Sequence, residues 1–165
     1  MGSLAALILA AGQGTRMKSD QVKVLHEVCG QPMVRYAVDV ARRATGTKPF
    51  VVVGYQADTV KEALDGDAVF TLQSQQLGTG HAVMQAEANL RGKYDEVIVL
   101  YGDTPLLSAE TLEALIATRR ASGAGCSVLT VDLPDPTGYG RIIRSDDRSN
   151  LIVRIAEQKD ASPAE

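Results

Sequence analysis

Two cations and a glycine loop follow the first apolar stretch of the chain. Residues 4–11 form an unbroken apolar run, with the length and composition of a buried strand. The run gives way at Gly12 to the sequence Gly-Gln-Gly-Thr-Arg, and Lys23 follows Arg16 by seven residues. Glycines let backbone N–H groups come close to an anion, and the cations neutralise its charge. The pattern predicts a phosphate-binding loop at the end of a strand.

Three more polar, glycine-bearing segments follow predicted strands. They begin at Gly54, span residues 73–80, and include Gly102 and Asp103. In open α/β sheets, ligands bind at the carboxyl ends of the strands. Taken alone, each segment is typical of a surface turn, in which the amides are loop residues, the cations are solvated and the aspartate belongs to the turn. Together they offer side-chain amides that can bind a nucleotide base, and one carboxylate. A single carboxylate suits a Mg²⁺ ion that is also bound by phosphate oxygens.

Alternating strands and helices must position these groups. Apolar runs predict five strands and helical spacing predicts the helices between them, with Asp58 and Ser108 as N-caps for two of the helices. A strand-rich tail follows, with two strands joined by a polar turn at residues 145–150. The predicted fold class is therefore α/β, a three-layer Rossmann-like fold with a mainly parallel mixed sheet. The predicted strands are residues 4–11, 50–53, 69–72, 96–101, 127–131, 141–144 and 151–157, and the helices are residues 33–44, 59–64, 81–90 and a segment after Ser108.

Length and charge narrow the function classes. The 165 residues suffice for one core, and the net charge of −3 gives no basic footprint for a nucleic-acid partner. No apolar run approaches the roughly 18–20 residues that span a bilayer, so we expect no membrane insertion and a cytoplasmic protein. Cys29 and Cys126 lie far apart, without metal-ligand spacing, and we expect two reduced thiols in or near the core.

Several catalytic motifs are excluded by spacing. The loop lacks the third small residue of the dinucleotide fingerprint, and no P-loop sequence is present. His26 and His81 have no nucleophile near them in the sequence, so acyl transfer has no support and each is interpreted as structural or as a hydrogen-bonding partner.

Five runs, in order and at family-like spacing, resemble the sugar-1-phosphate nucleotidyltransferases. Among these enzymes, they are most similar to the bacterial uridyltransferases that act on N-acetylglucosamine-1-phosphate. The runs are residues 9–17 with 23–25, 73–82, 101–106, 135–142 and 157–161. The resemblance implies transfer of UMP from UTP to the sugar phosphate with release of pyrophosphate and with Mg²⁺ as cofactor, in the synthesis of cell-envelope polysaccharide precursors.

The same resemblance implies a role for each matching residue. Arg16 and Lys23 would be catalytic, neutralising the triphosphate and the charge that develops at its α-phosphorus. The nucleotide phosphates and base would lie along Leu9, Ala10, Ala11, Gly12 and Gly14. The base would be recognised by the Gln73 amide and bordered by Gln76, Gly78 and Thr79. The ribose and phosphates would be bordered by Tyr101, Gly102 and Asp103, with Asp103 holding the metal. The sugar phosphate would contact Gly140 and Glu157.

The chain departs from the family pattern in two ways. Val22 stands where the family has proline, which is expected to loosen the loop that places Lys23, although valine keeps an extended backbone. Residues 4–165 are expected to be the N-terminal portion of the nucleotidyltransferase domain. The rest of that domain, with two asparagines of the sugar and metal sites, would be absent. The β-helix acetyltransferase domain through which full-length relatives form homo-oligomers would be absent too.

Three alternatives remain open at this point. The chain could be a related nucleotidyltransferase that uses another base or sugar. It could be a nucleotide-binding module without turnover, or an inactive α/β fragment. For the related nucleotidyltransferase, specificity for uridine over thymidine would depend on the segment around Gln73.

Overall fold

The computed structural model describes residues 2–14, 17–145 and 151–162, arranged in two compact units. The first unit is Met1–Gly125 and the second is Cys126–Glu165. The glycine loop, the segment around Gln73, and Asp103 all belong to the first unit. Gly140 and Glu157 belong to the second.

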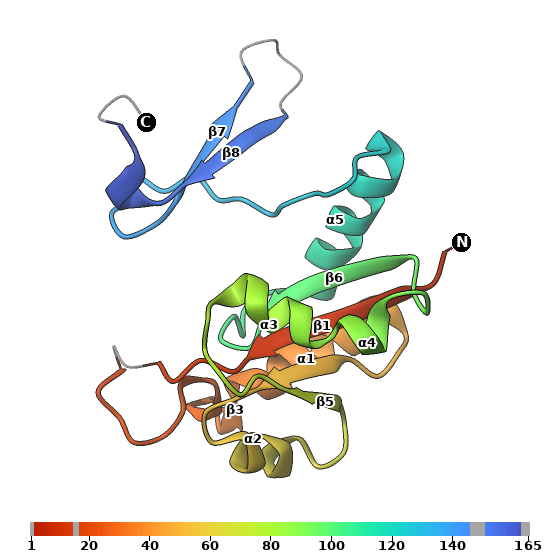
Figure 1. The fold of residues 1–165 in the computed structure, drawn as a ribbon, viewed down its shortest axis with the longest axis vertical. Helices are drawn as coiled ribbons and strands as arrows, with labels where there is room; N and C mark the ends of the chain where they lie inside the picture. Colours follow the sequence, from red (N-terminus) through yellow and green to blue (C-terminus); the bar gives the residue numbers. More distant parts are fainter. Residues whose placement is uncertain (1, 15–16, 146–150, 163–165) are drawn as a thin grey trace. The chain divides into compact units, whose positions relative to one another are not determined.

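A four-stranded parallel sheet forms the centre of the first unit (Figure 1). Its order is β5 (Val69–Leu72), β4 (Phe50–Val53), β1 (Leu4–Ala10) and β6 (Glu96–Tyr101). All three strand pairs are parallel, so the carboxyl ends of the four strands lie at one edge. This arrangement confirms the predicted α/β fold with a parallel sheet, and it gathers the loops that follow the strands.

Helices cover both faces of this sheet, giving the predicted three layers. Alternate residues of β1 separate the two faces, as expected for a strand buried on both sides. Ala6 and Ile8 share a core cluster with residues of α1 (Met33–Thr45), α2 (Ala57–Leu64) and α5 (Ala109–Ser122). Ala5 and Leu7 pack with residues of α3 (Thr79–Gln85) and α4 (Glu87–Leu90) on the other face. None of the described helices is long and apolar enough to span a membrane.

Short elements between β1 and α1 were not predicted. A 3₁₀ turn, η2 (Lys23–Leu25), is followed by an antiparallel pair of two-residue strands, β2 (Glu27–Val28) and β3 (Gln31–Pro32). Strands this short leave no periodic pattern in a sequence. They return the chain from Lys23 to the start of α1.

The second unit contains the predicted hairpin. Strands β7 (Arg141–Arg144) and β8 (Ile152–Ala156) pair antiparallel, and the short turn η3 (Gln158–Asp160) follows. Residues 146–150 of the predicted turn lie outside the described residues.

Four sequence predictions were wrong in detail. Residues 127–131 form no strand, and Val128, Leu129 and Val131 are exposed, so the β-branched composition lacks a sheet to pack on. The helix predicted at 81–90 is two short helices that meet at the buried Ala86.

The other two errors concern a cap and the cysteines. Helix α2 begins two residues early, after Gln56 in the left-handed region, so Asp58 lies in its first turn. There Asp58 pairs with Lys61 at 2.9 Å instead of capping the helix. Ser108 does cap α5, accepting from the Thr111 N–H. Both cysteines are free and exposed, which contradicts the expectation of thiols in or near the core.

Candidate functional site

The glycine loop after β1 packs directly against Lys23. Gly14 has φ +70°, and a Cβ at this position would lie 2.5 Å from the Cβ of Lys23. Only glycine permits both the left-handed backbone and this close approach. Met17 closes the loop by donating its N–H to the Gly14 carbonyl at 2.9 Å. Arg16, the other predicted cation, lies outside the described residues.

Lys23 forms an ion pair with Asp103 at the carboxyl edge of the sheet. The Lys23 Nζ lies 2.7 Å from the Asp103 Oδ2, and each side chain is about one-third exposed (35% and 31%). Asp103 follows β6, the immediate neighbour of β1. The sheet therefore brings together the predicted phosphate-binding cation and the predicted metal ligand, although the two are eighty positions apart in the sequence.

Gly102 allows the strand ends to approach each other. Its N–H donates to the Leu9 carbonyl at 2.9 Å, and a Cβ here would lie 3.3 Å from the Ala10 Cβ and 3.2 Å from Val24. Tyr101, just before it, is 49% exposed. The segments of residues 9–12 and 101–103 thus run side by side where β1 and β6 end.

Gln56 holds the backbone just before Lys23. The Val22 N–H donates to the Gln56 Oε1 at 3.1 Å, while the Gln56 Nε2 donates to the Asp20 carbonyl at 2.8 Å. Val22 is fully buried and has φ −59° and ψ 139°, the extended conformation that the sequence predicts. A proline could adopt this φ but has no N–H to donate. Sequence reasoning missed Gln56, and the signal available was its place just after the strand-end Gly54.

The Gln73 segment lies at the end of β5, on the far side of β4 from β1. Gln73 is 3% exposed, and its Nε2 donates to the Gly78 carbonyl at 3.1 Å and contacts the His81 Nδ1 at 2.9 Å. Gln76 is exposed and packs on Gly54, where an added Cβ would lie 2.8 Å from its Nε2. Thr79 begins α3 and is exposed. His81 is a hydrogen-bonding partner, one of the two roles expected for it.

Gly140 and Glu157 lie at the same end of the hairpin in the second unit. The hairpin register pairs Arg141 with Ala156, so the two predicted sugar-phosphate contacts continue the same end of the ladder. A Cβ on Gly140 would lie 3.3 Å from the Ala156 carbonyl, which explains the need for a small residue there.

The donor set suits a metal carried by the nucleotide more than one held by protein alone. No group of three or more His, Cys, Asp or Glu side chains forms a metal cluster within the described ranges. Asp103 offers one partly exposed carboxylate beside a cation. Mg²⁺ is commonly bound by one or two carboxylates with substrate phosphates and water completing its shell. The residues fit such a shared site.

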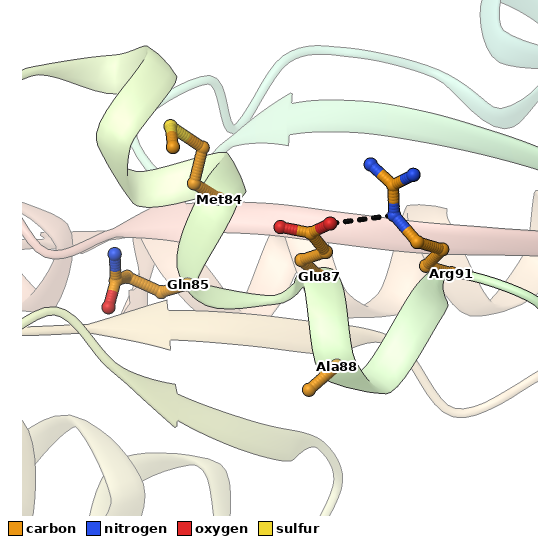
Figure 2. A pocket seen from close by; sticks show the side chains of 5 residues that line it. All are labelled: Met84, Gln85, Glu87, Ala88 and Arg91. Atoms are coloured by element: carbon orange, nitrogen blue, oxygen red, sulfur yellow. Dashed lines mark ion pairs between the residues drawn. The ribbon is translucent and has the colours of Figure 1, made fainter.

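A separate open pocket lies on α3 and α4 (Figure 2). Figure 2 shows Glu87 and Arg91 turned toward each other, and their ion pair measures 2.6 Å. None of the predicted site residues lines this pocket; its lining residues are Met84, Gln85, Glu87, Ala88 and Arg91.

Comparisons with known proteins place the chain in a family. A family model described as the MobA-like NTP transferase domain matches residues 6–151. The chain is 52% identical over 167 residues to "Bifunctional protein GlmU" of Geobacter metallireducens, covering 100% of the chain and 35% of the relative. It is 51% identical to the protein of the same name from Lactobacillus delbrueckii subsp. bulgaricus, covering 96% of the chain and 34% of the relative. The chain thus spans about a third of the length of these curated relatives.

Solved structures show the same fold at low identity. A nucleotidyl transferase from Methanothermobacter thermautotroptrophicus aligns with TM-score 0.60 and 22% identity, covering 70% of this chain and 57% of that one. Rv0371c of Mycobacterium tuberculosis in complex with manganese aligns with TM-score 0.59 and 23% identity, covering 72% and 60%. At this identity the likeness concerns the fold alone.

Proposed function

Because this chain belongs to the MobA-like NTP transferase family, we propose that it binds UTP with Mg²⁺ at the carboxyl edge of its sheet, for transfer of UMP to N-acetylglucosamine-1-phosphate. The observation that carries the proposal is the ion pair between Lys23 and Asp103 beside the glycine loop. The identity of about half of all residues to the GlmU proteins supports the choice of uridine and of this sugar. The product, UDP-N-acetylglucosamine, would serve cell-envelope polysaccharide synthesis.

In this proposal the glycine loop and Lys23 hold the triphosphate. Backbone N–H groups of residues 11–14 would bind the phosphates, and the Lys23 ammonium would neutralise charge at the α-phosphorus as the sugar phosphate attacks. Arg16 adds a second cation to the loop. The attacking and leaving oxygens need only in-line positioning and charge neutralisation, so no covalent nucleophile is required.

Asp103 would hold Mg²⁺ together with the nucleotide phosphates. When bound, the metal would neutralise phosphate charge and fix the geometry of the triphosphate. Lys23 pairs with Asp103 in the structure, and arrival of the nucleotide would give the ammonium a phosphate partner in its place. Gly140 and Glu157 would contact the sugar phosphate, and the Gln73 segment would contact the base.

The test is pyrophosphate release from UTP and N-acetylglucosamine-1-phosphate with Mg²⁺, paired with UTP binding. We expect UTP binding by this chain, and a fall of about tenfold or more in UTP affinity for Lys23→Gln, because a charged contact is lost. Lys18→Gln removes an exposed cation of the same segment and should leave affinity within about twofold. Absence of UTP binding in the unmodified chain would overturn the proposal. Binding without pyrophosphate release would assign the chain as a nucleotide-binding module.

A further inference from the structure

Two acceptors converge on the amide nitrogen of Gln73. Its Nε2 lies 3.1 Å from the Gly78 carbonyl oxygen and 2.9 Å from the His81 Nδ1. An amide nitrogen carries two hydrogens and accepts none, so it satisfies both acceptors at once. The opposite amide orientation would place the Gln73 oxygen against the carbonyl oxygen and the ring lone pair. The surroundings therefore fix which end of the amide faces which way.

This orientation leaves the Gln73 Oε1 as the group available to a ligand. Among the described residues this oxygen has no hydrogen-bond partner. It is not fully buried either, since the buried side-chain atom found without a partner in the described part of the chain is the His26 Nε2. The Gln73 oxygen therefore retains some contact with solvent, although the residue as a whole is buried at 3% exposure. A carbonyl oxygen in this position accepts hydrogen bonds and donates none. It favours a base edge that donates.

Uracil and cytosine differ at the atom such an acceptor would meet. Uracil carries a hydrogen on N3, whereas the N3 of cytosine is itself an acceptor. An acceptor fixed opposite N3 therefore favours uracil, and a freely turning amide would serve either base. A polar group that cannot turn rejects the wrong partner because it would be left unpaired.

The histidine must be in one tautomer to play this part. Neutral imidazole has one donor and one acceptor nitrogen. The Gln85 Nε2 lies 3.1 Å from the His81 Nε2 but also 3.1 Å from the His81 backbone carbonyl, which it can use as its acceptor. Nδ1 accepts from the Gln73 nitrogen in the tautomer that carries its proton on Nε2, and this is the tautomer that the inference requires.

We propose that His81 is a specificity-determining positioning residue: its Nδ1 fixes the Gln73 amide so that the site selects uridine over cytidine nucleotides. This inference rests on the proposed UTP site. His81 contacts no substrate itself and acts through Gln73.

The experiment compares the dissociation constants of UTP and CTP for the unmodified chain, His81→Leu and His81→Asn. His81→Leu removes one of the two acceptors that hold the Gln73 amide and leaves the Gly78 carbonyl as the other, and we expect the preference for UTP over CTP to fall about tenfold. Asparagine can place an amide oxygen near the position of Nδ1, so His81→Asn should keep the preference within about threefold. An unchanged preference in His81→Leu, or equal weakening of both nucleotides, would overturn the inference. Failure of the unmodified chain to bind UTP would instead overturn the proposed function.

A measurement on the unmodified chain does not depend on the variants folding or on nucleotide binding. The chain has two histidines, so ¹⁵N-labelled imidazole signals are simple to assign. We expect His81 to show a protonated Nε2 and an accepting Nδ1. A protonated Nδ1 on the neutral ring would contradict the proposal.

Discussion

The ion pair of Lys23 with Asp103 depends on a glycine as much as on the two charged groups. Gly14 lies in contact with the side chain of Lys23, whose Nζ forms the ion pair. A side chain at Gly14 would meet the Lys23 Cβ, a rigid part of that residue, so the lysine itself would have to move. At the residue scale, the lack of a Cβ at Gly14 makes room for the Lys23 side chain in its observed position.

Gly14→Ala is therefore expected to destabilise the fold and displace Lys23. The left-handed backbone alone costs about 1–2 kcal/mol for a residue with a Cβ, and the 2.5 Å approach adds to it. The free energy of unfolding from urea titration measures the loss. Gly12→Ala is the matched control, because no atom lies within 4 Å of its Cβ position and its φ is not positive. Equal stability of the two variants would show that Gly14 does not constrain the loop.

At the scale of elements, the segment before Lys23 is held by a residue from the next strand-end loop. Gln56 connects the backbone at Asp20 and Val22 through both ends of its amide. The family pattern has proline at the Val22 position, which would restrict φ covalently. Here a hydrogen bond from Gln56 and full burial of Val22 hold the same extended backbone.

Gln56→Ala should loosen the Lys23 segment without unfolding the chain. The buried Val22 N–H would lose its acceptor, a cost of about 1–3 kcal/mol for an unsatisfied group. Hydrogen exchange of the Val22 amide should become faster by tenfold or more. Exchange of the Val60 amide, which donates to the Gln56 backbone carbonyl in α2, should change little because alanine retains that carbonyl. Unchanged Val22 exchange would contradict the assigned role of Gln56.

A second contact between elements depends on pH. Asp67, just before β5, accepts from Arg42 at 2.7 Å and from Arg35, both on α1, and these two guanidinium groups hold the pKa of the Asp67 carboxyl below its usual range. A pKa that is lower in the folded chain than in the unfolded chain gives stability above the unfolded value of about 3.9. That stability is lost as the pH falls through the folded pKa.

Asp67→Asn is expected to lower stability at pH 7, where the carboxylate is charged in the unmodified chain. The difference between the two proteins should shrink as the pH falls below about 4. Thermal unfolding across this pH range measures it. Glu113→Gln removes an exposed carboxylate of α5 for which no ion pair is found among the described residues, and it serves as the control. A difference that grows on acidification would contradict the sign of the pKa shift.

At the scale of the whole molecule, the sequence predicted the strands of the central sheet from their apolar composition. The apolar runs at 50–53, 69–72 and 96–101 are strands with the predicted bounds. Residues 50–53 are buried throughout, as in a strand covered on both faces, whereas the edge strands β5 and β6 leave several apolar side chains exposed, among them Leu72 and Val99. Residues 127–131 have a similar composition but no strand forms there, because strand formation needs a partner edge that composition does not specify.

The candidate site also has a part that the sequence predicts and a part that it does not. Chemistry-bearing residues at strand ends were predictable, because parallel topology brings those ends to one edge. Their partners were not, since Gln56 with Val22 and His81 with Gln73 depend on side-chain geometry after folding. The two-residue strands β2 and β3 are below the length at which periodicity can be detected.

The most direct test of the account is the Mg²⁺ dependence of UTP binding, measured by calorimetry on the unmodified chain and on Asp103→Asn. The amide keeps the shape of the carboxylate and removes its charge. Its effect therefore separates a metal-assisted phosphate site from simple attraction of the triphosphate to Lys23. The account predicts that Mg²⁺ strengthens UTP binding by about tenfold or more in the unmodified chain, and that Asp103→Asn loses most of this gain. UTP binding that is equally strengthened by Mg²⁺ in both proteins, or no UTP binding at all, would contradict it.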